Sequence, residues 1–339
     1  MVQLPDGPRG IVAGAPMGSG EQLMRIPLRC AMTSAIARES PATYGVFTDP
    51  TAQAMLKNRS EAVKDYLALT MWLLDALQRQ QFNSYKLFLR SLPRQLDNFP
   101  TFWSDKELEL LPKSVLGRVA SKRQAILKEY YTVSGLRHEF GRRFSSTDFL
   151  RAWLLVISRN YGLSRSSGRV RAMIPVADLF NHDRPANTIW YLDRSTDSFV
   201  LNTTEPLPMG ANVRISYGRK SQSDLLCSYG FTLPCDSPRT KCVHELSLVH
   251  EGRAYYLTFS QSSTKPLLKR LAEKLGRGAE FDAFSALIDH EAARHGSLED
   301  VQSRLRVAVS NKERDALRVV ESHLRVLQFW KETPCYDVQ

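Results

Sequence analysis

Two short segments at a fixed spacing constrain this chain more than any other feature of its sequence. The first, residues 174–182, is an apolar run that contains Asp178 and ends in the pair Asn181-His182. The second, residues 213–218, alternates like a strand and brings Tyr217 to a glycine, 35 residues after His182. Each segment alone is typical of an ordinary turn or strand end. The two together, in this order, favour a functional site.

The two segments resemble the cofactor-binding and catalytic motifs of SET-domain protein methyltransferases. They are most similar to the Rubisco large-subunit methyltransferase group, in which a helical insert splits the SET domain. The resemblance implies an α+β fold: a SET β-fold with a pseudoknot, a helical insert, and a mostly helical C-terminal domain. It implies a SET domain over residues 1–235 with the insert at about 52–145, and a substrate-binding-like domain over 236–339.

The implied reaction transfers a methyl group from S-adenosylmethionine to a protein amine. A free lysine has a pKa of about 10.4, so the site must favour its neutral form by excluding water. A tyrosine hydroxyl can hold the amine without adding a competing nucleophile, and the resemblance gives Tyr217 this catalytic role. An asparagine side chain offers both a donor and an acceptor, which suits the cofactor-binding role implied for Asn181 and His182.

A glycine-punctuated turn near the N-terminus resembles the opening of SET domains, where the backbone approaches the cofactor. By position, the resemblance therefore assigns cofactor binding to Gly7, Pro8, Arg9 and Gly10.

The resemblance also implies substrate-binding residues, namely Arg159, Tyr161, Asp178 and Tyr229. Structural roles are the alternative for three of them. Arg159 can meet the dipole of a helix C-terminus or pair with Asp178. Tyr229 can pack at the end of a helix that Gly230 caps.

The predicted acceptor is lysine, because Tyr161 is aromatic as in the lysine-modifying relatives. An aromatic wall suits an aliphatic stem with a cationic head. A protein-histidine methyltransferase stays open as an alternative. The histidine-modifying relative has a polar amide at the position equivalent to Tyr161, and in this chain Asn160 lies one residue away. A third alternative is an inactive SET-like binding module, which the presence of Asn181, His182 and Tyr217 disfavours.

Composition bears on the compartment and the partners. Five scattered cysteines, an odd number, predict a reducing compartment rather than a disulfide framework. The spacing of Cys235 and Cys242 is not that of a zinc site, so no metal is expected. No signal peptide or membrane-length apolar run is visible, which predicts a cytoplasmic or nuclear location. The formal charge of +11 favours acidic protein partners, and we expect a monomer. Nucleic acid is not expected as a partner, because no motif for it is recognisable.

Hydrophobic spacing predicts the remaining elements. Strands and turns are expected over 7–45, and helices from Ala52 to about Val133, with Ser104 and Glu107 as a capping box. Two strands are expected within 243–259, and three amphipathic helices after them.

Overall fold

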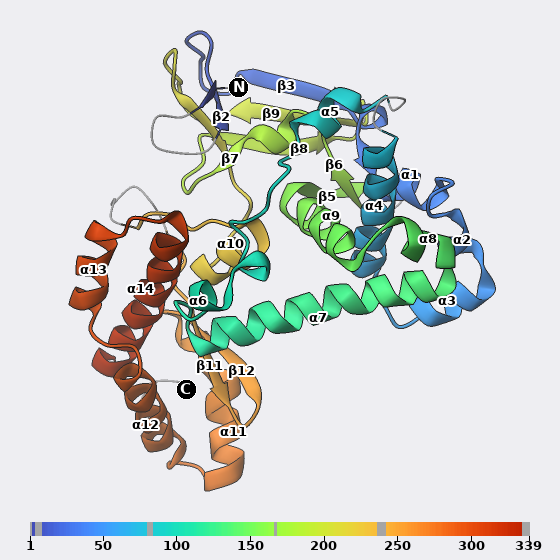
Figure 1. The fold of residues 1–339 in the computed structure, drawn as a ribbon. Helices are drawn as coiled ribbons and strands as arrows, with labels where there is room; N and C mark the ends of the chain where they lie inside the picture. The colour runs from blue at the N-terminus through green and yellow to red at the C-terminus, as the bar shows by residue number, and fades with distance from the viewer. Residues whose placement is uncertain (1, 4–8, 80–83, 166–167, 236–241, 334–339) are drawn as a thin grey trace. The chain divides into compact units, whose positions relative to one another are not determined.

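The computed structural model describes residues 2–3, 9–79, 84–165, 168–235 and 242–333 (Figure 1). Contacts divide the chain into two compact units: Met1–Gln95 with Arg123–Tyr217, and Leu96–Lys122 with Gly218–Gln339. Helix α7 (Lys113–Leu136) contributes residues to both. Helices and short strands occur in each unit, which confirms the predicted α+β class. The predicted domain boundary at residue 235 is a different division, and it stays a prediction.

The described part of the first unit contains three small sheets. The sheet that carries the candidate site has the order β1-β2-β10-β7, with strands Val2–Gln3, Arg9–Val12, Asn212–Ile215 and Asn181–His182. The second has the order β3-β9-β8, with strands Gln22–Pro27, Ser198–Thr203 and Thr188–Asp193. The third has the order β4-β6-β5, with strands Met32–Thr33, Gly168–Met173 and Asn160–Arg165.

Strand β10 is the central strand that assembles the site. It runs antiparallel to β2, with Val213 opposite Ile11, and parallel to β7, with Ile215 opposite His182. Val213 and Ile215 are buried in the apolar cluster of these sheets, so the alternation of β10 sets its register. Strands β2 and β7, which are far apart in sequence, therefore lie on either side of β10.

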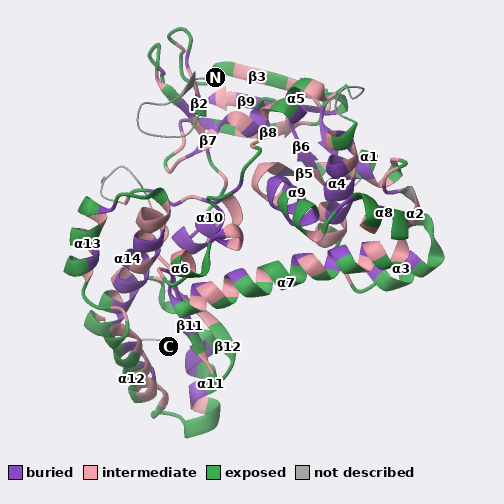
Figure 2. Ribbon diagram, in the orientation of Figure 1, coloured by how far each residue is buried: buried purple, intermediate pink, exposed green. Residues whose placement is uncertain are grey.

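Helices cover the rest of the first unit. They are α1 (Ser34–Glu39), α2 (Tyr44–Thr48), α3 (Pro50–Leu56), α4 (Glu61–Gln78), α5 (Lys86–Ser91), α8 (His138–Arg143) and α9 (Ser146–Arg159). Helix α4 packs against α1 and α9, and Figure 2 shows its largely buried surface.

The prediction of strands and turns over 7–45 is wrong at its end, because α1 begins at Ser34. The hydroxyl of Thr33 accepts the backbone N–H of Ile36 at 3.2 Å and so caps this helix.

The second unit begins with the 3₁₀ turn Pro100–Phe102 and the short helix α6 (Asp105–Leu108). The predicted capping box at its start is confirmed, since Glu107 Oε2 accepts the backbone N–H of Ser104 at 2.8 Å. Helix α10 (Gln222–Tyr229) follows later in the chain. Trp103, Val115, Leu226 and Val319 belong to the apolar cluster that joins these segments.

The predicted pair of strands within 243–259 is confirmed as the hairpin β11 (Leu246–His250) and β12 (Arg253–Leu257). Glu251 and Gly252 between them both have positive φ, as a two-residue hairpin turn requires. Four helices follow instead of the expected three: α11 (Lys265–Leu275), α12 (Glu280–Ala293), α13 (Leu298–Val307) and α14 (Asn311–Glu332). None of the described helices is both long and apolar enough to cross a membrane.

The cysteines of the second unit require a correction. A disulfide joins Cys235 and Cys242, whose Cα atoms are 5.8 Å apart, although the sequence predicts reduced thiols. A count of cysteines cannot reveal which of them the fold brings within bonding distance. Cys227 is a buried free thiol, and Cys30 in the first unit is an exposed one.

Candidate functional site

Tyr217 and His182 form the centre of the candidate site. Tyr217 lies two residues beyond β10, and its ring stacks on the His182 ring with 4.9 Å between the centroids and 16° between the planes. The backbone N–H of Tyr217 donates to His182 Nδ1 at 3.1 Å. The same nitrogen lies 3.3 Å from the carbonyl oxygen of Ile215, so two backbone groups at the end of β10 hold the imidazole in position. The Tyr217 hydroxyl donates to the carbonyl oxygen of Phe180 at 2.8 Å.

Asn181 connects this centre to the N-terminal strand. Its Nδ2 donates to the carbonyl oxygen of Arg9 at 3.2 Å, across 172 positions of sequence. Within the described part of the chain, Asn181 Oδ1 has no hydrogen-bond partner, and the side chain is half-buried. Gly10 is buried in β2 beside Arg9. The predicted residues Gly7 and Pro8 lie outside the described residues.

Arg159 and Asp178 form an ion pair whose carboxylate is buried and whose guanidinium is partly exposed. Arg159 Nη1, at the end of α9, donates to Asp178 Oδ2 at 2.8 Å and to the Asp178 carbonyl at 3.1 Å. The carboxylate is fully buried, and this burial raises the pKa of Asp178, whereas the charges of Arg159 and Arg9 act to lower it. Asp178 Oδ1 and Arg159 Nε are buried without a hydrogen-bond partner among the described residues.

Tyr161 is a core residue in this structure. Its ring packs edge-to-face against Trp190 and Phe199, and only 8% of the residue is exposed. Its hydroxyl donates to the carbonyl of Ala177 at 2.7 Å, next to Asp178 in the short 3₁₀ turn Ala177–Leu179. It therefore holds the turn that carries the ion pair, and its predicted contact with a substrate stays a prediction.

The side-chain amide of the neighbouring Asn160 makes hydrogen bonds within the protein through both its nitrogen and its oxygen. Its Nδ2 donates to the carbonyls of Val156 and Ile157, at 2.8 and 2.9 Å, and so closes the last turn of α9. Its Oδ1 accepts from Arg171 at 2.9 Å. This amide is therefore satisfied by protein groups.

Tyr229 ends α10 and belongs to the second unit, whereas the other described site residues belong to the first. Gly230 follows with φ of 76° and donates to the carbonyls of Leu225 and Leu226, which closes the helix. The expected glycine cap is confirmed. The role of Tyr229 toward a substrate stays a prediction.

Two features of the site were missed from the sequence. Phe180 contributes a backbone carbonyl, which no side-chain motif reveals. Val176, just before the 3₁₀ turn, has φ of 71°, a strained conformation for a β-branched residue, and the residue is 51% exposed. An apolar side chain at that position gives no signal of either property.

The fold of the chain is shared with solved structures of known proteins. It is similar over 98% of its length to a crystal structure of the SET domain of LSMT bound to lysine and AdoHcy, with a TM-score of 0.69 and 16% identity, covering 85% of that chain. A structure of Rubisco LSMT bound to AdoMet gives the same TM-score at 17% identity, with the same shares covered. The chain has the SET-domain fold of these structures.

Sequence comparison confirms the predicted resemblance to the Rubisco large-subunit methyltransferase group. The chain is 25% identical over 241 residues to the ribulose-1,5-bisphosphate carboxylase/oxygenase large subunit N-methyltransferase of Nicotiana tabacum, covering 66% of this chain and 45% of that protein. It is 24% identical over 240 residues to the [fructose-bisphosphate aldolase]-lysine N-methyltransferase of Arabidopsis thaliana, with the same shares covered. The chain thus spans about half the length of these relatives. No family model matches it.

Proposed function

We propose that this protein is an S-adenosylmethionine-dependent protein-lysine N-methyltransferase that acts on a protein other than a histone. The observation that carries the proposal is the assembly of Tyr217, His182, Asn181 and the Arg9 backbone at neighbouring strands of a SET fold. The names of the relatives, which refer to Rubisco and to aldolase lysine, support the class of substrate.

The residues present fit the proposed cofactor. Asn181 Oδ1, which has no partner within the described residues, is an acceptor suited to the ammonium of an amino acid moiety. Asn181 Nδ2 is meanwhile held by the Arg9 carbonyl, so the amide orientation is set before binding. S-adenosylmethionine would supply the methyl group from its sulfonium. We propose that Gly7 and Pro8, in the turn expected from the sequence, contribute backbone contacts to the same ligand.

The protein's own contribution to the reaction is to orient the amine. The Tyr217 hydroxyl donates its one hydrogen bond to the Phe180 carbonyl, so toward an amine its oxygen acts as an acceptor. An N–H of the lysine directed at this oxygen leaves the nitrogen lone pair aimed along another tetrahedral direction. Alignment of this kind contributes a large share of the rate of a displacement.

Lysine is the proposed acceptor rather than histidine. A histidine acceptor needs a hydrogen-bond partner on its far ring nitrogen to fix its tautomer. Asn160, the amide nearest in sequence to the expected place, is already bonded to Val156, Ile157 and Arg171. This supports the lysine assignment.

The test is transfer of a labelled methyl group. The full chain and its Tyr217→Phe variant are incubated with labelled S-adenosylmethionine and a fractionated cell extract, and the labelled protein is mapped by mass spectrometry. We expect one labelled lysine with the wild type and a strongly reduced signal with the variant. Label on a histidine would overturn the lysine assignment. Cofactor binding without any label would favour an inactive module.

Compartment and assembly belong to the same proposal. The sequence predicts the cytoplasm or nucleus, whereas the Cys235–Cys242 disulfide does not support a reducing compartment and the relatives above are named as chloroplastic. We also expect a monomer without affinity for nucleic acid. Microscopy of the tagged protein in its own cells, size-exclusion chromatography and a salt-dependent mobility shift check these points in turn.

A further inference from the structure

The second unit contains a cavity of about 500 Å³, and four of its nine lining residues are arginines. Arg306 comes from the end of α13, and Arg314, Arg318 and Arg325 come from α14. Glu321 is the one acidic residue among the lining residues. The volume lies within the range of about 300–1,000 Å³ that is typical of small-molecule sites.

Most of this positive charge is not neutralised by the protein. Arg325 pairs with Glu321 at 2.7 Å. Arg314 donates to the carbonyls of Ala308 and Val309 and to Asn311, so its guanidinium is held in place by neutral groups.

Arg306 and Arg318 have no hydrogen bond or ion pair with any residue that the structure describes. The carboxylate of Asp315, outside the lining, interacts electrostatically with Arg314 and Arg318. Its Oδ1, however, accepts from the backbone and hydroxyl of Thr232. The cavity thus contains two guanidiniums that protein groups bind, those of Arg314 and Arg325. The other two, those of Arg306 and Arg318, have no hydrogen-bond partner among the described residues.

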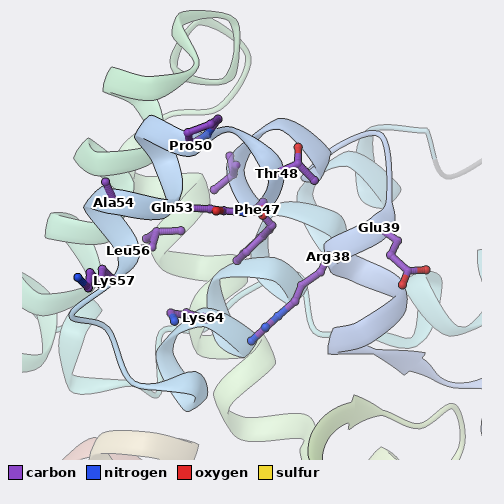
Figure 3. Close-up of a pocket in the computed structure, with 11 residues that line it drawn as sticks. Arg38, Glu39, Phe47, Thr48, Pro50, Gln53, Ala54, Leu56, Lys57 and Lys64 are labelled. Atoms are coloured by element: carbon purple, nitrogen blue, oxygen red, sulfur yellow. Dashed lines mark hydrogen bonds between the residues drawn. The ribbon is translucent and has the colours of Figure 1, made fainter.

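A cavity in the first unit provides the contrast. It has a volume of about 700 Å³ and lies among α1 to α4, with Arg38, Lys57 and Lys64 among apolar side chains (Figure 3). There Arg38 pairs with Glu61 and Asp65, and Lys64 pairs with Glu61. Its cations are largely neutralised by neighbouring acids, so it has no comparable attraction for an anion.

We propose that Arg306, Arg314, Arg318 and Arg325 form a binding site for a small organic phosphate that carries two or more negative charges. A guanidinium presents a planar fork of donors that matches phosphate oxygens, and bonds between charged partners are the stronger ones. Like-charged arginines that share a cavity repel one another, and a dianion between them removes this repulsion. The inference does not depend on the proposed methyltransferase activity.

Carboxylates of an acidic peptide offer similar chemistry. The cavity has the volume of a small-molecule site, whereas a bound peptide strand runs along a longer groove, so we favour the small molecule. The two ligands are therefore compared directly, with pyrophosphate as the small probe and hexaglutamate as the peptide probe.

The experiment is calorimetric titration of the full chain with each probe at low salt. We expect saturable binding of one pyrophosphate, weakened about ten-fold or more by Arg318→Gln and by Arg306→Gln. Arg304→Gln is the matched control, since it removes the same charge from an exposed position of α13 outside the cavity lining, and it should change affinity less than about two-fold. Circular dichroism melts verify that each variant is folded.

Three outcomes would overturn the proposal. The first is no saturable heat with millimolar pyrophosphate. The second is an equal loss of affinity in Arg304→Gln, which would mean a diffuse effect of net charge. The third is tighter binding of hexaglutamate than of pyrophosphate, which would assign the cavity to a protein partner instead.

Discussion

The hydroxyl of Tyr217 donates a hydrogen bond to the carbonyl oxygen of Phe180, with 2.8 Å between the two oxygens. Phe180 immediately precedes strand β7, and the Tyr217 ring also stacks on His182 within that strand. The segment from Phe180 to His182 thus contacts both the hydroxyl and the ring face of Tyr217. The position of the phenol oxygen is set by the backbone, which is the preorganisation that catalysis requires.

Tyr217→Phe removes the hydroxyl and leaves the stacked ring in place. We expect turnover to fall by orders of magnitude while cofactor affinity changes little, because the hydroxyl acts mainly in the transition state. The lost hydrogen bond should lower the free energy of unfolding by about 1 kcal/mol. Single-turnover kinetics and denaturant melts measure both effects. Tyr191→Phe, on the exposed face of β8, is the control, and variant turnover within about two-fold of wild type would remove Tyr217 from the mechanism.

Asn181→Ala should weaken S-adenosylmethionine binding by about ten-fold or more, since it deletes both the proposed acceptor and the bond to the Arg9 carbonyl. Titration calorimetry measures the affinity. Asn212→Ala, an exposed residue at the start of β10, serves as the control and should bind normally. Unchanged affinity in Asn181→Ala would place the cofactor elsewhere.

Arg159→Met leaves the Asp178 carboxylate buried without its cation. The free energy of unfolding at neutral pH should fall by about 3 kcal/mol. Burial already raises the pKa of Asp178, and loss of Arg159 raises it further. In this variant the neutral, protonated carboxyl of Asp178 is tolerated in the folded state. Its contribution to the free energy of unfolding is therefore fully present below about pH 4 and is lost as pH rises through the raised pKa of Asp178.

Urea melts from pH 4 to pH 8 give this profile for Arg159→Met. Arg165→Met breaks the more exposed pair with Asp197 and should cost less than about 1 kcal/mol at every pH. A profile for Arg159→Met as flat as that of this control would contradict the burial argument.

His323 on α14 is fully buried, and neither ring nitrogen has a partner among the described residues. Burial lowers the pKa of His323 to about 3, so protons bind preferentially to the unfolded chain. Its contribution to stability is fully present above about pH 6.5 and decreases as pH falls toward 3, by up to about 1.4 kcal/mol per pH unit. His323→Leu should remove this dependence. Melts between pH 4 and pH 7 test it, with the exposed His290→Gln expected to keep the wild-type slope.

Sequence patterns predicted the elements whose signals are local. The Ser104–Glu107 box, the Glu251-Gly252 hairpin and the Gly230 cap depend on residues a few positions apart, and all three are present. The start of α1 was missed because Thr33 caps a helix inside a stretch of strands. The Cys235–Cys242 disulfide was missed because a cysteine count contains no distances.

The sequence by itself determined which residue types are available for chemistry: an asparagine, a histidine and a tyrosine at a spacing typical of one family. Only the tertiary structure decided which of them meet. Strand β10 pairs with both β2 and β7, which brings Asn181 to Arg9 and Tyr217 to His182. It also joined Arg159 to Asp178 and gathered four arginines around one cavity. Pairing and burial between distant segments depend on hydrogen bonds and packing of the whole fold, and no local periodicity contains them.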